Sequence, residues 1–322
     1  MRRTLSVCSV GSSVFIVLSF LCGAVSAADV TMEKSDTGVV VKLGGQPFTT
    51  YLFKSGAKPV LWPVIGPTGK EMTRAYPMRE GNKLEKTDHI HQRSFWFTHG
   101  DVNGVDFWAE TGEPGKKLGR IEHNELVKAE GGTAGIIVTK NTWLGPDGAK
   151  ICADERTLRF GGEAETRWID FDVTVTALAD KVTFGDTKEG SFGLRVDETL
   201  KVEANQGGRI INAEGVLDKE AWGKASPWVD YHGPAQGDHV GIAILNHPSS
   251  FRFPSYWHVR PYGLFAANPF GLHDFMPATK EKAGAHEMKK GDKFMLRYRV
   301  IFHKGDEKEG KIAEAYKKYA GN

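Results

Sequence analysis

Strict alternation of apolar and polar residues is the feature that most limits how this chain can fold. From Ile169 to Ala177 every second residue is apolar, and the residues between them are Asp or Thr. The segment from Phe294 to Phe302 repeats this period of two. A period of two predicts a strand with one buried face. Shorter runs predict further strands over residues 38–43, 136–141, 157–160, 192–196 and 240–245.

Turn signals separate these strands and leave little room for helices. They lie at residues 44–45, 131–132, 146–148, 161–162 and 207–208, and each contains glycine. One helix is expected at the C-terminus, where Ile312, Ala315, Tyr316 and Tyr319 form an apolar stripe. Many short strands with few helical patterns predict an all-β fold, a large antiparallel β-sandwich with a C-terminal helix.

The first 27 residues have the organisation of a secretory signal peptide. Arg2 and Arg3 precede the apolar run 14–21, and small residues follow up to a cleavage site expected after Ala27. No later stretch is long and apolar enough for a membrane span. We therefore expect an exported protein, periplasmic or secreted, with a single domain over residues 28–322 and no membrane anchor.

Charge and cysteine content narrow the function classes further. The net charge of +2 disappears with Arg2 and Arg3, which leaves 40 basic and 40 acidic residues. A neutral chain has no electrostatic basis for binding nucleic acid. Cys152 is the one cysteine after the signal peptide, so neither an internal disulfide nor a cysteine-based metal site is expected. No glycine-rich segment has the spacing of a phosphate loop, and there is no haem motif.

The densest polar and aromatic stretch runs from residue 88 to residue 108 and reads DHIHQRSFWFTHGDVNGVDFW. It combines three His, three Asp, one Arg and one Asn with large aromatic side chains. Aromatic walls with a few convergent polar groups are typical of a small-molecule pocket. We therefore expect the functional site here.

The histidines of this stretch allow two interpretations. On a strand, His89 and His91 would point to the same face, a geometry that can chelate a metal ion with His99 or His258 as a third ligand. Arg93 opposes a metal there because it places a permanent cation beside the pair. A hydrogen-bonded or substrate-facing pair is the favoured interpretation, and no cofactor is expected.

The charged residues that follow also have structural alternatives. Arg93 suits a carboxylate or an oxygen-rich substrate, or else an ion pair with Asp88 or Asp101. Asp101 and Asn103 lie in a glycine-containing turn, and their alternative role is purely structural, with hydrogen bonds to the backbone of that turn. A single carboxylate among aromatic residues, such as Asp106, could serve as a general acid or base.

A second polar and aromatic cluster spans residues 246–271. Alternation there places His258 and Arg260 on one face, opposite Trp257 and Val259. Aromatic faces and planar polar side chains are what sugar binding uses, and both clusters supply them. The alternative is an aromatic-rich core with satisfied His and Arg side chains.

Taken together, these segments resemble the family labelled "methane oxygenase PmoA", a domain of unknown function in exported bacterial proteins. The segments that carry the resemblance are 88–93, 96–104, 106–108, 228–231, 240–244, 246–248, 257–260, 262–271 and 297–300. The family pattern is Asp-His-Pro-His-His-Arg where this chain has Ile90 and Gln92. The resemblance implies membership of polysaccharide-degrading gene sets and a fold like the β-supersandwich of aldose mutarotases. Those enzymes use a His and a carboxylate, but no residue pair carries over to this chain. A methane monooxygenase is not expected, because no transmembrane segment follows the signal peptide.

The sequence thus predicts an exported carbohydrate-active protein that acts on an oligosaccharide or polysaccharide fragment. The favoured chemistry is acid–base hydrolysis, elimination or epimerisation. The expected catalytic residues are His91 and His99 for proton transfer, Asp106 or Asp101 as the carboxylate, and His89 and His258 in support. The expected substrate-binding residues are Arg93, Asn103, Trp108, Trp257, Arg260, Asn268 and His247. The alternatives are a non-catalytic sugar-binding module and a metal-dependent enzyme with ligands at His89, His91 and His99.

Overall fold

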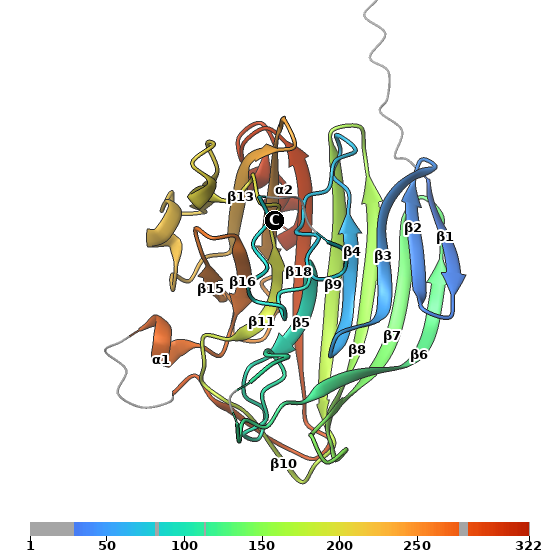
Figure 1. The fold of residues 1–322 in the computed structure, drawn as a ribbon, viewed down its shortest axis with the longest axis vertical. Coiled ribbons are helices and arrows are strands. Elements are labelled where there is room, and N and C mark those ends of the chain that lie inside the picture. The colour runs from blue at the N-terminus through green and yellow to red at the C-terminus, as the bar shows by residue number, and fades with distance from the viewer. Residues whose placement is uncertain (1–28, 81–83, 113, 277–282, 322) are drawn as a thin grey trace, which may run out of the picture.

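Two eight-stranded antiparallel sheets form the fold in the computed structural model, which describes residues 29–80, 84–112, 114–276 and 283–321. Sheet A contains, in order, β1 (Val30–Ser35), β2 (Gly38–Leu43), β3 (Gln46–Ser55), β4 (Lys58–Val64), β5 (Phe95–His99), β11 (Gly190–Arg195), β16 (Leu264–Asn268) and β15 (Tyr256–Val259). Sheet B contains β12 (Arg209–Asn212), β13 (Trp228–Ala235), β14 (Asp238–Asn246), β18 (Lys293–Lys304), β9 (Thr166–Ala177), β8 (Lys150–Gly162), β7 (Gly135–Leu144) and β6 (Arg120–Glu130). Figure 1 shows the two sheets as layers of a sandwich.

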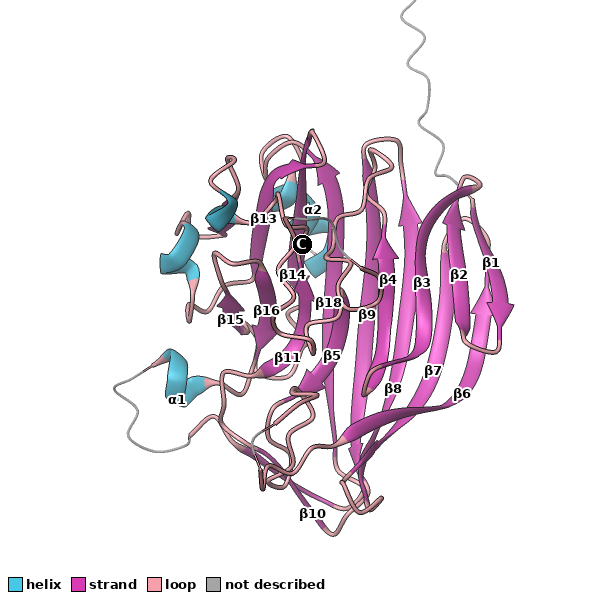
Figure 2. Ribbon diagram, viewed as in Figure 1, coloured by secondary structure: helices cyan, strands magenta, loops and turns pink. Residues whose placement is uncertain are grey.

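The remaining elements of the described residues are short. β10 (Lys181–Phe184) pairs with β17 (His286–Lys289), and the helices are α1 (Leu272–Phe275) and α2 (Ile312–Ala320). Two 3₁₀ turns lie at Val202–Ala204 and Asp218–Ala221. Figure 2 shows how little of the chain is helical. No helix in the described ranges is long and apolar enough to cross a membrane.

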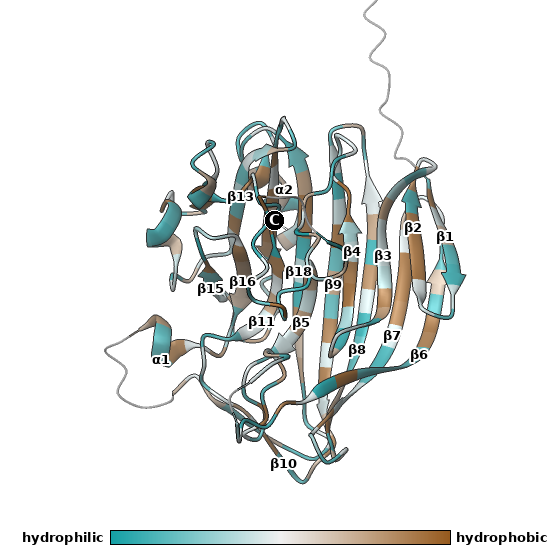
Figure 3. Ribbon diagram, viewed as in Figure 1, coloured by the Kyte–Doolittle hydropathy of each residue, from teal (hydrophilic) through white to brown (hydrophobic). Residues whose placement is uncertain are grey.

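The predicted β-sandwich with a C-terminal helix is confirmed. Each long alternating segment lies within a strand, β9 or β18, and Figure 3 shows the alternating bands of hydropathy along β7, β8 and β9. The five shorter predicted strands correspond to β2, β7, β8, β11 and β14, although β11 ends one residue early, at Arg195. The apolar stripe predicted for the C-terminal helix lies on α2 and packs on sheet B, with Ile312 fully buried. The predicted signal peptide lies outside the described residues.

The main core lies between the two sheets. Phe95 and Phe97 of β5 contact Phe171 of β9, with ring centroids 5.9 and 6.2 Å apart. Phe192 of β11 stacks on Tyr298 of β18 at 4.4 Å. Alternate residues of these strands therefore fill the sandwich, as a period of two requires.

The opposite side of sheet A, here called the outer face, carries a smaller apolar cluster. Trp96 lies between Phe95 and Phe97, so its side chain points to this face. It packs there with Val60, Trp108, Leu264 and Ala266. Trp108 comes from the loop after β5, which shows that this loop covers part of the outer face. The candidate site described below lies on this side of the sheet.

One expectation about local structure is wrong. Residues 88–94 form no strand but an irregular segment, in which His89 and Ser94 have positive φ angles of 45° and 54°. The side chains of His89 and His91 therefore owe their positions to loop geometry, and not to strand alternation.

Candidate active site

A cavity of about 690 Å³ lies over the outer face of sheet A. We call it the outer-face cavity. It is lined by His89, His91, Gln92, Asp106, Trp108, Ala109, Thr111, Lys116, Lys188, Glu189, Trp222, His258, Arg260, Tyr262 and Asp274. These residues come from both clusters predicted by the sequence, so the fold brings the two clusters together around one space. Its volume lies in the range of small-molecule pockets.

Six of the thirteen predicted site residues line this cavity. They are His89, His91, Asp106, Trp108, His258 and Arg260. The other seven do not line it, and they are described below. Residues that the sequence did not single out as site residues complete the lining, above all Glu189, Lys188 and Lys116.

His258 is held in one tautomer by the backbone. It lies on β15 and shares the outer face with Arg260, as the predicted alternation requires, while Trp257 points into the core. Its Nδ1 lies 2.7 Å from the carbonyl oxygen of Lys188. Because a carbonyl only accepts, Nδ1 carries the proton and Nε2 keeps a free lone pair. Burial lowers the pKa of His258 to about 4, so the ring is neutral at pH 7 and Nε2 is a potential base.

His91 is a second neutral imidazole at the cavity. Burial lowers its pKa to about 4, and the charges of Lys58 and His89 act in the same direction. Its ring lies 6.1 Å from that of Trp108 and 5.7 Å from that of His89. Two imidazoles with low pKa values are unprotonated near neutral pH and can accept hydrogen bonds from a ligand, whereas their strength as bases is best matched to a more acidic pH.

A stacked group of side chains forms another part of the wall. The rings of His89 and Tyr262 are nearly parallel, with centroids 5.4 Å apart. The Arg195 guanidinium lies 4.7 Å from the centre of the Tyr262 ring and donates a 2.6 Å hydrogen bond to Gln92 Oε1. Gln92 thus holds the Arg195 guanidinium against the Tyr262 ring.

Two carboxyl groups of the lining, Asp106 and Glu189, differ in environment. Asp106 Oδ1 accepts hydrogen bonds from the backbone N–H groups of Trp108 and Ala109, at 2.7 and 2.8 Å, and Oδ2 lies 2.6 Å from Lys116 Nζ. Both oxygens are therefore engaged. Burial raises the pKa of Glu189, and the nearby Asp106 charge adds to the effect although Lys188 opposes it. Glu189 is thus the carboxyl group better suited to carry a proton.

Two indole groups complete the aromatic part of the lining. Trp108 is almost fully buried, and Trp222 is half-buried. Neither indole N–H has a hydrogen-bond acceptor among the described residues. Because both N–H groups are themselves buried, what these residues offer at the cavity wall is the apolar surface of their rings.

Three predicted residues near β5 have structural partners. His99 is fully buried, with Nε2 2.8 Å from the carbonyl of Gly185 and Nδ1 3.1 Å from Ser191 Oγ. Asp101 accepts a hydrogen bond from the N–H of Gly104, and Asn103 bonds to the backbone of residues 181 and 183. These are the bonds of the turn expected as the structural alternative.

The remaining four are held by other contacts. Arg93 pairs with Glu110 at 2.6 Å, and not with either predicted aspartate. Trp257 lies in the main core and donates to the carbonyl of Ser226. Asn268 bonds to the backbone of residues 187 and 270. His247 lies at the surface beside the Tyr319 ring.

The geometry gives a metal ion little support. His99 does not line the cavity with His89 and His91. Across the described residues, no group of three or more His, Cys, Asp or Glu side chains is arranged to hold an ion. The expectation that no metal is needed stays a prediction and is tested below.

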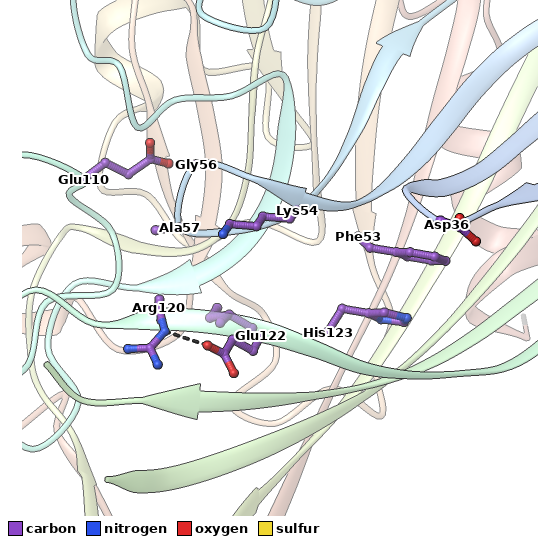
Figure 4. A pocket seen from close by; sticks show the side chains of 10 residues that line it. Asp36, Phe53, Lys54, Gly56, Ala57, Glu110, Arg120, Glu122 and His123 are labelled. Atoms are coloured by element: carbon purple, nitrogen blue, oxygen red, sulfur yellow. Dashed lines mark hydrogen bonds and ion pairs between the residues drawn. The ribbon is translucent and has the colours of Figure 1, made fainter. Parts of the chain in front are cut away.

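A second cavity, of about 670 Å³, lies between β3 and β6 (Figure 4). Glu110 in its wall is already paired with Arg93 and with Lys58 Nζ at 2.8 Å. Figure 4 shows Phe53 lying over His123, and the two rings stack at 4.0 Å. Burial acts to raise the pKa of Glu110, but Lys58 and Arg93 outweigh it and lower that pKa. With a single imidazole and this ion-paired carboxylate, the second cavity is a weaker candidate for acid–base chemistry than the outer-face cavity.

Comparison with known sequences gives a family but no activity. The profile of DUF6807, a family of unknown function, matches residues 38–317. This match confirms the expectation of a domain of unknown function, whereas it gives no support to the label "methane oxygenase PmoA". No curated protein matches the chain.

Comparison with solved structures finds similarity to proteins that act on sugars. A β-arabinopyranosidase is 10% identical, with a TM-score of 0.31 over 84% of this chain and 38% of its own. The galactosidase domain of an α-galactosidase–sucrose kinase is 9% identical, with a TM-score of 0.40 over 86% and 42%. A putative aldose 1-epimerase from Escherichia coli K12 is 10% identical, with a TM-score of 0.31 over 85% and 99%. The chain thus spans about two fifths of the first two structures and nearly all of the third.

Proposed function

We propose that this chain, which belongs to the DUF6807 family of unknown function, is a carbohydrate-active enzyme that uses acid–base chemistry in the outer-face cavity. One observation carries the proposal. Two neutral imidazoles, His91 and His258, share a single cavity with Glu189, a carboxyl group of raised pKa. Groups whose environments move their pKa values in opposite directions are the usual partners in acid–base catalysis.

The roles follow from the protonation states. Nε2 of His258 has a free lone pair and is the first candidate for the general base, with His91 as the second. Glu189 retains its proton to higher pH than an ordinary glutamic acid and is the candidate general acid. Asp106 holds the loop that carries Trp108, because both its oxygens are engaged.

A sugar fits the remaining lining. Trp222 and Tyr262, which are only partly buried, offer aromatic surface for the C–H face of a pyranose ring. The reaction would be the hydrolysis, elimination or epimerisation of a sugar in an oligosaccharide or polysaccharide fragment.

Single-residue variants test the assignment on a substrate found in a panel of plant and algal oligosaccharides. Products are detected as new reducing ends, as unsaturated sugars by their ultraviolet absorbance, or as epimers by NMR. We expect His258→Gln and Glu189→Gln each to lower kcat by about 10²–10⁴-fold. His247→Gln is the control, because His247 lies at the surface outside the cavity. Unchanged turnover in both cavity variants would refute the proposal.

The pH profile provides a second test. Activity should fall below about pH 4 as His258 becomes protonated, and it should fall again as Glu189 loses its proton. A bell-shaped profile is therefore expected, with its acidic limb near pH 4. A rate that rises steadily from pH 5 to pH 9 contradicts these roles.

A non-catalytic sugar-binding module is the second candidate, because the aromatic walls alone suffice for binding. In that case no product forms with any sugar that binds. Trp222→Ala would then weaken binding, whereas His258→Gln and Glu189→Gln would bind as the wild type does.

A further inference from the structure

The charged side chains of the outer-face cavity are unevenly paired. Lys116 lies 2.6 Å from Asp106, and Lys188 Nζ lies 3.7 Å from Glu189. Arg260 also lines the cavity, but within the described residues it has no carboxylate partner. Arg260 is thus the cation of this lining whose charge remains unpaired and available to a ligand.

Arg260 is fixed and directed toward the cavity. It follows β15 on the face that carries His258, and its guanidinium lies 5.6 Å from the centre of the Trp222 ring. A guanidinium over an indole is held by cation–π attraction while its N–H donors remain free in the plane. Burial is the main cause of the low pKa of His258, and the charge of Arg260 lowers it further. The charge therefore acts at the proposed base.

The other charges of the lining do not cancel this cation. Asp106 is neutralised by Lys116. Asp274 accepts a 2.8 Å hydrogen bond from the backbone N–H of Lys188, which occupies one of its oxygens. The three cations of the lining, Lys116, Lys188 and Arg260, face three carboxyl groups, Asp106, Glu189 and Asp274, but among the described residues only Lys116 and Lys188 are paired with one of them. An anion is therefore favoured beside Arg260 itself.

We propose that the outer-face cavity selects an acidic sugar, whose carboxylate or sulfate ester binds the Arg260 guanidinium while its ring lies against Trp222. Two parallel N–H···O bonds join a guanidinium to either anion, and charge-assisted bonds of this kind are about twice as strong as neutral ones. A neutral sugar would cover Arg260 without pairing its charge, which is unfavourable. This inference rests on the proposed sugar function and adds the class of substrate.

Equilibrium binding to the intact protein tests the proposal. The probes are glucuronic and galacturonic acid for the carboxylate, glucose 6-sulfate and galactose 6-sulfate for the ester, and glucose and galactose as neutral matches. Isothermal titration calorimetry gives the ratio of affinities within each matched set. We expect an acidic sugar to bind at least tenfold more tightly than its neutral match. The preferred acid identifies the anionic group.

Two substitutions then assign the preference to Arg260. Arg260→Gln should remove most of the tenfold preference, measured as the ratio of the acidic to the neutral affinity. Arg260→Lys keeps the charge without the planar fork, so it should retain part of the preference. Arg120→Gln is the control, because Arg120 is exposed, pairs with Glu122 and lines the second cavity.

The outcomes separate the two proposals. If neutral sugars bind as tightly as acidic ones, or if Arg260→Gln leaves the ratio unchanged, the acidic-sugar inference is wrong and the sugar function stands. If no sugar of either kind binds, and none is turned over in the oligosaccharide panel, both are wrong. Arg260→Lys keeps the test decisive even if Arg260→Gln fails to fold.

Discussion

The buried ion pair between Asp154 and Arg156 should be the most sensitive electrostatic contact in the sandwich. Asp154 accepts hydrogen bonds from Arg156 at 2.8 and 3.1 Å, from Asn141 at 2.7 Å and from the Trp143 indole at 2.6 Å. The side chains of the pair are 0% and 1% exposed. Asp154→Asn would leave the guanidinium uncompensated in the core. Breaking such a pair costs about 3–5 kcal/mol of the free energy of unfolding.

Urea denaturation followed by circular dichroism and tryptophan fluorescence measures this loss. The control is Asp172→Asn, because Asp172 pairs with Arg159 and Arg297, which are 43% and 32% exposed. Exposed pairs contribute about 0–1 kcal/mol, so the control should stay close to the wild type. Replacing both partners, as in Asp154→Leu with Arg156→Met, removes the unpaired charge but leaves the Asn141 amide and the Trp143 indole without their acceptor, so it should restore only part of the stability. Equal losses for the two single variants would refute the reasoning.

Three further predictions concern pH, metal and processing. His303 donates to Asp230 Oδ2 at 2.7 Å; burial lowers its pKa, but Asp230 outweighs burial and the pKa is raised above 6.5. The pair therefore stabilises the fold fully below pH 6.5, and this contribution is lost as the pH rises through the higher pKa of folded His303. The difference in stability between the wild type and His303→Gln, measured from urea midpoints, should thus shrink between pH 6 and pH 9. A constant difference would contradict this. Turnover should survive EDTA, and elemental analysis of protein prepared without chelator should find no stoichiometric transition metal. When the protein is expressed in a bacterial host and the cells are fractionated, it should be found outside the cytoplasm, and mass spectrometry should give Ala28 as its first residue. A cytoplasmic, uncleaved chain would show that the signal peptide prediction is wrong.

The fold was predictable where one face of a strand is buried and the other is not. β9 and β18 alternate because one side faces the main core and the other lies at the surface of sheet B. β5 shows the limit of this rule, since all five of its residues are buried and its sequence has no alternation. Its outer face is covered by the loop that carries Trp108, and a strand buried on both faces is not recognisable by period.

The site was predictable as two clusters but not as a set of residues. His89, His91 and His258 belong to segments rich in polar and aromatic groups, and such composition marks a pocket without its geometry. His99 has the same composition around it, yet β5 turns it toward Gly185 and Ser191. Composition could not separate these cases, because partners far along the chain decide which imidazole faces the cavity.

Glu189 shows most clearly why the chemistry needed the fold. Nothing in the sequence around it resembles a site, and an isolated glutamate has an ordinary pKa. Its raised pKa comes from burial and from the charge of Asp106, 83 positions away in the chain. The residue before it, Lys188, supplies the carbonyl oxygen that fixes the tautomer of His258. The segment before β11 thus provides the candidate acid and also orients the candidate base. A displacement of this segment would therefore disturb both roles together, so Glu189 and His258 should behave as one unit when they are mutated singly and in combination.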